Sequence, residues 1–544
     1  METVSLVLLL LVAVVASSAL TRMSPVSVPV PLVQIAFGAV IGLSTHIRVE
    51  LDPEIFFLLF LPPLLFLDGW RIPKDELLRD KALVLELALG LVVVTVVGMG
   101  WLLHIMIPLM PLAVAFALAA VLSPTDPIAV SAIASRVPIP RRMMHILEGE
   151  SLFNDASGLV CLRFAIAAAL TGEFSAGKAA LSFLWAAGAG MLIGAGVAFC
   201  VTRAKGWISS RYGEDWGSQI LISLLIPFGA YLLAEHLHAS GILAAVAAGV
   251  SMTFAEFSIQ SLPVTRMRRG SVWDTIQFAG NGIIFVLLGE QFPQIVHSAA
   301  RTVETAGHQD PWWLIFYVVV VTLALIALRF AWVWGSMRLT LLKRREQRPF
   351  RSSDLRLVSA MSFAGVRGAI TLAGILTLPL AMNDGTAFPA RDLAIFIAAG
   401  VILLSLVVAS IALPLLLKGL EMPSEDAAIE EEDRLRLTLA KAAVAAIDKA
   451  RDRMAAGADD TGVYDRAADR VAGMYQDRID LKNRDDAAAR RAREEDTIDR
   501  HLRLAAFRAQ RDLLFRMARR REVGSALASK LTRELDLIEV RLKG

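Results

Sequence analysis

The sequence has few charged residues and few cysteines for its length. Only 20% of its 544 residues are charged and 56% are hydrophobic, whereas a soluble globular protein has about 25% charged and 45–50% apolar residues. This shortage of charge excludes an ordinary soluble domain and predicts a membrane protein. The net charge of +3 is too small to indicate a nucleic-acid partner. The only two cysteines, Cys161 and Cys200, lie in apolar stretches, which argues against a disulfide framework.

The charged residues that are present gather at the C-terminal end. Residues 421–544 hold 26 basic and 26 acidic residues, nearly half of those in the whole chain. The sequence therefore predicts a transmembrane domain over residues 1–420 and a hydrophilic, cytoplasmic C-terminal domain over residues 421–544. In the second domain an apolar stripe at helical spacing predicts an amphipathic helix, one of three or four, and its members are Leu527, Leu531, Leu535, Ile538 and Leu542.

Thirteen apolar stretches in the first domain are candidates for helices that cross the membrane, which takes about 20 residues each. They lie near residues 3–20, 27–44, 55–70, 83–107, 111–135, 146–170, 179–202, 217–236, 239–256, 273–291, 312–336, 356–380 and 393–417. The first lacks the basic residues that precede a signal peptide, so we expect it to stay as the first transmembrane helix.

The basic residues between these stretches predict the orientation. Alternate loops hold 21 of them and the intervening loops hold four. Because basic loops stay in the cytoplasm, the N-terminus is expected outside and the C-terminal domain inside the cell.

A few charged residues fall within the stretches, where each costs about 2.5–3.5 kcal/mol and therefore needs a partner or a function. Structural roles are expected for two of them, Arg163 and Arg329, which can snorkel or form pairs inside the bundle. The six charged residues in question are Asp126, Glu150, Asp155, Arg163, Arg329 and Arg367.

The motif Ser-Pro-Thr-Asp-Pro places Asp126 in the fifth stretch between two prolines. Because Pro124 and Pro127 lack an N–H and clash with the preceding turn, we expect the helix to be interrupted around Thr125–Asp126. Such a break is tolerated where it faces protein or a water-filled cavity, and its free carbonyls can coordinate a cation. A simple proline kink with Asp126 as a cap is the alternative.

The sixth stretch begins with the segment GESLFNDASGLV, which is rich in oxygen-bearing side chains. On a helix, Glu150 and Asn154 share one face, and Ser151 and Asp155 share the adjacent face. Carboxylate, amide and hydroxyl oxygens are hard ligands that suit Na⁺. A structural polar network between helices is the alternative.

Arg367 lies in the twelfth stretch between Gly365 and Gly368, which favour an unwound or closely packed helix. The fifth and twelfth stretches are seven apart, so they cross the membrane in opposite directions. This is the pattern of inverted-repeat transporters, whose site lies where two interrupted helices meet. Arg367 would either neutralise a carboxylate there or form a structural salt bridge. In the tenth stretch, helix packing explains Asn281 at least as well as function does.

Taken together, these motifs resemble those of the monovalent cation:proton antiporter-1 family, the NhaP/NHE-type sodium/proton exchangers, and particularly its bacterial YjcE-like branch. The matching segments are SPTDPIAVSAI, GESLFNDASGLV, SGILAAVAAGV, NGIIFVLLG and FAGVRGAITLA. The resemblance implies an all-α polytopic membrane fold with inverted repeats and interrupted helices. It also implies a homodimer in which each protomer has a cation-binding core and a dimerisation domain.

The resemblance implies a set of site residues as well. Glu150 is expected to form an ion pair with Arg367 near the site. Asn154 cannot exchange a proton, and electroneutral relatives carry Asn–Asp where electrogenic ones carry two aspartates, so one-for-one exchange is expected. The residues expected at the cation and proton site are Asp155, Asp126, Ser151, Thr125 and Asn154.

The sequence thus predicts an antiporter of Na⁺ (or Li⁺ or K⁺) and H⁺ in the cytoplasmic (inner) membrane, serving pH and sodium homeostasis. A proton and a cation would compete for the buried carboxylate of Asp155. No enzymatic activity and no cofactor beyond the transported ions are expected. The nearest alternative is a K⁺/H⁺ antiporter. A cation channel and a membrane scaffold or sensor are the rivals from other classes.

Overall fold

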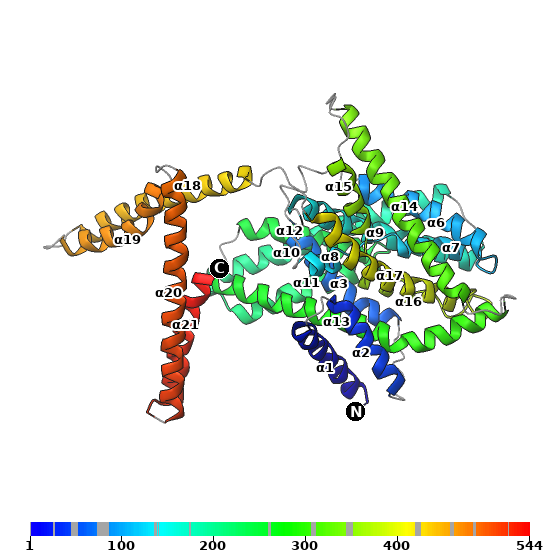
Figure 1. Ribbon diagram of the computed structural model, residues 1–544, viewed down its shortest axis with the longest axis horizontal. Coiled ribbons are helices and arrows are strands. Elements are labelled where there is room, and N and C mark those ends of the chain that lie inside the picture. The colour runs from blue at the N-terminus through cyan, green and yellow to red at the C-terminus, as the bar shows by residue number, and fades with distance from the viewer. Residues whose placement is uncertain are drawn as a thin grey trace. The chain divides into compact units, whose positions relative to one another are not determined.

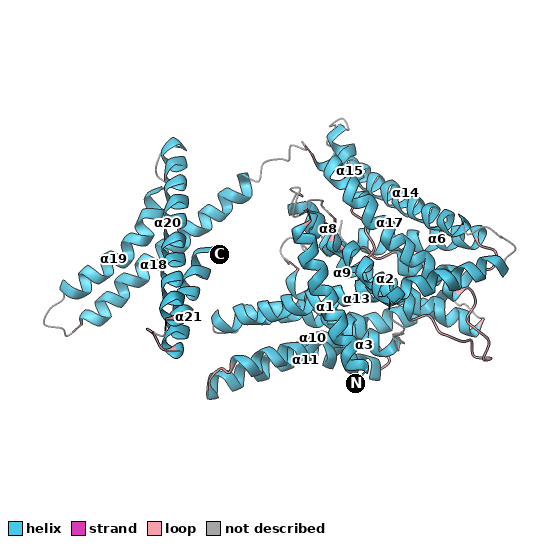
Figure 2. Ribbon diagram, turned by 60° about the horizontal axis from the view of Figure 1, so that its bottom comes forward, coloured by secondary structure: helices cyan, strands magenta, loops and turns pink. Residues whose placement is uncertain are grey.

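A computed structural model of the chain describes residues 2–24, 28–44, 53–72, 86–134, 139, 141–172, 176–258, 263–305, 312–343, 352–418, 426–456, 462–481, 486–520 and 522–543. The chain divides into two compact units, Met1–Leu420 and Glu421–Gly544. Both are built from helices (Figure 1). Figure 2 shows helices in both units. In the part of the chain that is described, the only β pairing is an isolated bridge between Ala381 and Ala387.

The first unit has a helix, or a pair of helices, in every stretch where the sequence predicts one. The helical fold class is therefore confirmed. The elements are α1 (Glu2–Met23), α2 (Val30–Ser44), α3 (Pro53–Arg71), the π-helix η1 (Glu86–Gly90), α6 (Leu91–Met106), α7 (Leu112–Leu122), α8 (Pro127–Ala134), α9 (Arg141–Thr171), α10 (Ala176–Tyr212), α11 (Trp216–His236), α12 (Gly241–Ser258), α13 (Pro263–Thr305), α14 (Trp312–Lys343), α15 (Ser352–Phe363), α16 (Ala369–Leu376) and α17 (Arg391–Leu417).

Many of these helices fit a bilayer by length and composition. Among the described residues, seven helical segments are long and apolar enough to cross a membrane, and four shorter apolar helices accompany them. A polytopic membrane protein is thus confirmed. The count of thirteen spans and the external N-terminus stay predictions.

The exposed side chains of the first unit also fit a lipid environment. On α10, Leu184, Trp185, Leu192 and Phe199 are 65–76% exposed, which is unfavourable in water and favourable against lipid tails. In contrast, 67% of the apolar 18-residue segment of α17 is buried, whereas the corresponding share in the other long apolar helices is 22–44%. The helix α17 therefore lies at the centre of the bundle.

Close helix crossings hold part of this bundle together. A Cβ atom on Gly38 of α2 would lie 1.9 Å from the carbonyl oxygen of Val286 on α13. In the same way, a Cβ atom on Gly289 of α13 would lie 2.0 Å from the carbonyl oxygen of Ile35 on α2. Only glycine allows the two backbones to approach this closely, as small residues commonly do in membrane helix pairs.

The second unit consists of α18 (Asp426–Ala455), α19 (Gly462–Leu481), α20 (Asp486–Arg519) and α21 (Ser525–Lys543), which pack in the pairs α18–α19 and α20–α21 (Figure 1). Arg511 of α20 forms ion pairs with Asp536, at 2.8 Å, and with Glu539 of α21. The predicted apolar stripe lies on α21, but its members Leu527, Leu531 and Ile538 are exposed. The packed face of α21 instead includes Ala528 and Glu539.

Candidate functional site

Two helices of the first unit are interrupted, and their breaks meet. The helix α7 ends at Leu122 and α8 begins at Pro127; α15 ends at Phe363 and α16 begins at Ala369. The predicted break around Thr125–Asp126 is therefore confirmed, and its cause is the pair of flanking prolines. The backbone N–H of Asp126 donates a hydrogen bond of 2.7 Å to the carbonyl oxygen of Val366, which joins the two breaks directly.

Gly368 allows the side chain of Asp126 to lie against the second break. A Cβ atom at position 368 would lie only 1.8 Å from Oδ2 of Asp126 and 2.5 Å from its Cγ. Any larger residue would have to push the carboxylate away. This glycine therefore has a steric role at the junction of the two breaks.

A partly open cavity lies at this junction; the space between its lining atoms, open solvent included, is about 400 Å³. Three carboxylates line it, and no basic side chain is among its lining residues in the described part of the chain. The lining residues are Leu64, Asp68, Pro124, Thr125, Asp126, Pro127, Ser151, Asp155, Asn281, Gly368, Ala369, Ile370 and Thr371.

Four of the five residues predicted to bind cation and proton line this cavity: Asp155, Asp126, Ser151 and Thr125. Asp155 is only 2% exposed, and the Ser151 hydroxyl donates a hydrogen bond of 3.2 Å to its Oδ2. The predicted pairing of Ser151 and Asp155 one turn apart on a helix is thus present on α9.

The fifth predicted residue, Asn154, lies outside the cavity lining. Its Nδ2 donates to Oγ1 of Thr125 at 3.0 Å and to Oε1 of Glu150 at 3.5 Å. The Thr125 hydroxyl in turn donates to Oε1 of Glu150 at 3.4 Å. Asn154 therefore links the first break to α9 from behind the cavity.

Asp68 is the cavity carboxylate that sequence reasoning missed. It lies in the last turn of α3 and lines the cavity together with Asp126 and Asp155. It was not among the charged residues considered within the stretches, since it lies near the end of the predicted stretch 55–70. An available signal was that it is the only charged residue in the predicted stretch 55–70. The three carboxylates are spread around the cavity, since no three His, Cys, Asp or Glu side chains in the described part of the chain are gathered closely enough to hold a metal ion.

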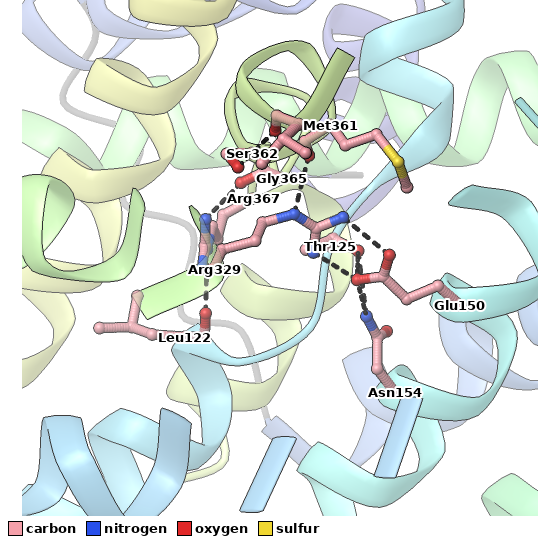
Figure 3. Close-up of polar contacts among 10 residues, drawn as sticks. Leu122, Thr125, Glu150, Asn154, Arg329, Met361, Ser362, Gly365 and Arg367 are labelled. Carbon is pink, nitrogen blue, oxygen red and sulfur yellow. Dashed lines mark hydrogen bonds and ion pairs between the residues drawn. The ribbon is translucent and has the colours of Figure 1, made fainter. Parts of the chain in front are cut away.

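Glu150 forms a buried ion pair, but with Arg329 of α14, so the predicted pairing with Arg367 is wrong. The two guanidinium nitrogens of Arg329 bind the two carboxylate oxygens, with Nη2 at 2.7 Å from Oε2 and Nη1 in contact with Oε1 (Figure 3). Arg329 Nε also donates to the carbonyl oxygen of Met361 at 2.9 Å. Glu150 is fully buried and Arg329 is 2% exposed. This bidentate geometry satisfies both carboxylate oxygens of Glu150, so Arg367 binds other partners.

Arg367 binds backbone carbonyls at both breaks. Its Nε donates to the carbonyl oxygen of Leu122 at 2.9 Å, and its Nη1 donates to that of Gly365 (Figure 3). Its own N–H donates to Oγ of Ser405 on α17 at 3.2 Å. Leu122 is the last residue of α7, where unpaired carbonyls carry partial negative charge. Arg367 thus neutralises the end of one half-helix from within the other break.

Arg163 has a structural role, as expected. Its Nη2 lies 2.8 Å from Oε1 of Glu235 on α11, and the two side chains are 44% and 34% exposed. It does not line the cavity.

The sequence matches a protein family over most of the first unit. The family model for the sodium/hydrogen exchanger transmembrane domain matches residues 7–419. The chain belongs to the sodium/hydrogen exchanger family. The family resemblance proposed from the motifs is thereby confirmed.

Several relatives within this family are similar to the chain. The Na⁺/H⁺ exchanger YjcE of Escherichia coli is 40% identical over 100% of this chain and 99% of its own. A sodium, potassium, lithium and rubidium/H⁺ antiporter of Bacillus pumilus is 42% identical over 76% of this chain, and that of Bacillus subtilis is 41% identical over 76%. The chain spans only 61% and 62% of those two proteins.

A solved structure supports the fold. The sodium proton antiporter MjNhaP1 of Methanocaldococcus jannaschii superimposes with a TM-score of 0.60 at 20% identity, over 77% of this chain and 99% of that one. The chain therefore shares the fold of that antiporter over most of its length.

Proposed function

We propose that this protein is a secondary transporter that exchanges a monovalent cation for a proton at the cavity between the two helix breaks. One observation carries the proposal: three carboxylates line the cavity, and the lining residues that the structure describes include no basic side chain. A buried negative charge is more stable with a counter-charge, and in this cavity a proton or a bound cation can supply it. Membership of the sodium/hydrogen exchanger family supports this assignment.

Asp155 is the carboxylate for which the two ions would compete. It is the most buried of the three and accepts a hydrogen bond from Ser151, which leaves its second oxygen for the ion. Asn154 beside it cannot take up a proton. The charge of Glu150 is held by Arg329 and does not need to change.

Exchange of one cation for one proton follows if the other cavity carboxylates keep their protonation state. Replacing Na⁺ by H⁺ then leaves the total charge of the cavity unchanged, and the protein can reorient with either ion bound. An empty site would be reoriented with an extra negative charge, which is unfavourable in the membrane. The cost of reorienting an empty site would prevent uncoupled movement of cations or protons. The unchanged charge of the occupied site would make the exchange electroneutral.

The transported cation is proposed to be Na⁺, with Li⁺ or K⁺ as further substrates and K⁺/H⁺ antiport as the alternative. The names of the two Bacillus relatives, which include potassium and rubidium, favour a broad range. We further propose a homodimer in the cytoplasmic membrane, with the N-terminus outside and residues 421–544 in the cytoplasm. Its role would be pH and sodium homeostasis, as a transporter and not an enzyme.

Everted membrane vesicles with a pH-sensitive dye test this proposal. Addition of Na⁺, Li⁺ or K⁺ should release protons from vesicles that contain the protein, and Asp155→Asn should abolish the release while the protein still inserts. The matched control is Asp384→Asn, in an exposed loop where the carboxylate accepts hydrogen bonds from Thr386. Proton release by Asp155→Asn at the wild-type rate would refute the proposal. A cation current without proton coupling would indicate a channel.

A further inference from the structure

Among the residues that the structure describes, two polar side chains that line the cavity make no polar interaction, and the proposed function gives them no role. Four neutral polar side chains line the cavity. Ser151 is bonded to Asp155, and Thr125 is bonded to Asn154 and Glu150. The amide of Asn281 and the hydroxyl of Thr371 make no hydrogen bond or other polar interaction among the residues that the structure describes.

Both side chains are held in place by rigid elements. Asn281 lies on α13 next to Gly282, where a Cβ atom would be 2.6 Å from Cγ1 of Val14 and 2.9 Å from Nε2 of Gln34. This tight contact fixes the backbone beside Asn281. Thr371 is 2% exposed in the first turn of α16, directly after the second break. Both residues line the cavity from helices that carry none of the three carboxylates.

Thr371 is buried and Asn281 is half-buried, and a polar group without a protein partner is more stable where water or an ion in the cavity satisfies it. Water or a cation can do so, since several polar side chains line the cavity and it is partly open. An amide oxygen and a hydroxyl oxygen are neutral, weak-field ligands. The carboxylates around them supply the charge and a stronger field.

These two kinds of ligand act differently on ions of different size. Small Li⁺ and Na⁺ gain most from a few close carboxylate oxygens. Larger K⁺ and Rb⁺ need more ligands at longer distance, so each additional neutral oxygen matters more to them. We propose that Asn281 and Thr371 are cation-selectivity residues, which contact the ion directly or through one water and extend the transported range to K⁺ and Rb⁺. The inference rests on the proposed antiport at this cavity and names two of its ligands.

The test measures the apparent KM for Li⁺, Na⁺, K⁺ and Rb⁺ in everted vesicles for Asn281→Ala and Thr371→Val. The apparent KM for K⁺ and Rb⁺ should rise by about two- to tenfold relative to that for Na⁺, the range expected for one lost polar contact. Thr371→Ser keeps the hydroxyl and should keep the wild-type ratios. The ratio among ions is the decisive quantity, because a merely structural defect would change all four values alike.

Matched controls carry the same substitutions outside the cavity. Asn383→Ala removes an exposed amide that donates a hydrogen bond to the carbonyl oxygen of Leu170. Thr322→Val removes a buried hydroxyl that donates to the carbonyl oxygen of Val318. Both should leave the ion ratios unchanged. If Asn281→Ala fails to insert, Asn281→Ser takes its place, since it shortens the side chain while keeping it polar.

The possible outcomes separate this inference from the proposed function. Proton exchange in both cavity variants with unchanged ion ratios would overturn the inference and leave the antiport intact, as would an equal loss for all four ions. A wild-type protein that exchanges only Na⁺ and Li⁺ would also overturn it. A wild-type protein that exchanges no cation for protons would instead refute the proposed function.

Discussion

The ion pair between Glu150 and Arg329 should be the most sensitive electrostatic contact in the protein. Both side chains are almost completely buried, at 0% and 2% exposed. Removing one partner leaves the other charge buried without compensation, which costs about 3–5 kcal/mol in buried pairs. We therefore expect Glu150→Gln and Arg329→Met each to lower the free energy of unfolding by about that amount. The double substitution should be less destabilising than either single one.

A double-mutant cycle measures this coupling. Unfolding of the purified variants in micelles with increasing amounts of a denaturing detergent gives the four free energies. The interaction term between Glu150 and Arg329 should exceed about 3 kcal/mol, at or above the upper end for directly contacting residues. A second cycle with Glu150→Gln and Arg367→Met should give a clearly smaller term, because Arg367 binds the backbone at Leu122 and Gly365 instead.

The control is a second arginine–carboxylate pair that also involves α9. Arg163 and Glu235 are 44% and 34% exposed, so water screens their attraction and their coupling should stay at or below about 1 kcal/mol. A coupling of Glu150 to Arg367 as large as that to Arg329 would refute the assignment of partners. Equal coupling in the buried and the exposed pair would refute the argument from burial.

Three further predictions concern the cavity, the tail and the stoichiometry. Gly368→Ala should abolish most exchange, because the new Cβ atom would lie 1.8 Å from Oδ2 of Asp126. The control Gly335→Ala, whose Cβ atom would have no neighbour within 4 Å, should stay active, and equal exchange rates in the two variants would contradict this prediction. Truncation after Leu420 should leave an active transporter with altered stability or pH response, and an inserted but inactive protein would show that the tail takes part in transport. In proteoliposomes an imposed membrane potential should not change the exchange rate, while a potential-driven rate would reveal a second proton.

The sequence predicted the two helix breaks because their causes are local. Pro124 and Pro127 remove hydrogen-bond donors and obstruct the preceding turn, whatever the rest of the chain does. Gly365 and Gly368 mark the second break in a similar way. Likewise, the one-turn spacing between Ser151 and Asp155 fixes their contact as soon as the segment is a helix. Features of this kind can be derived from a few neighbouring residues.

The partner of Glu150 could not be derived in this way. It depends on which distant helix lies beside α9, and Arg329 is 179 residues further along the chain. Both buried arginines were plausible partners by charge alone. Asp68 was missed for a related reason: the sequence places it near the end of a helix, and only the packing of α3 against the breaks brings that end to the cavity.

The arrangement of charges suggests why the protein needs buried groups that never bind the ion. Arg367 neutralises the carbonyls at the end of α7, and Arg329 neutralises Glu150, so the breaks and the helix behind them carry compensated charge. The remaining negative charge lies on the cavity carboxylates, among lining residues that include no described basic side chain. A cation or a proton is then the available counter-charge. If either arginine turned instead toward the cavity, it could replace the transported ion, and the coupling between cation and proton would be lost. Both arginines bind groups outside the cavity lining, as the proposed exchange at this cavity requires.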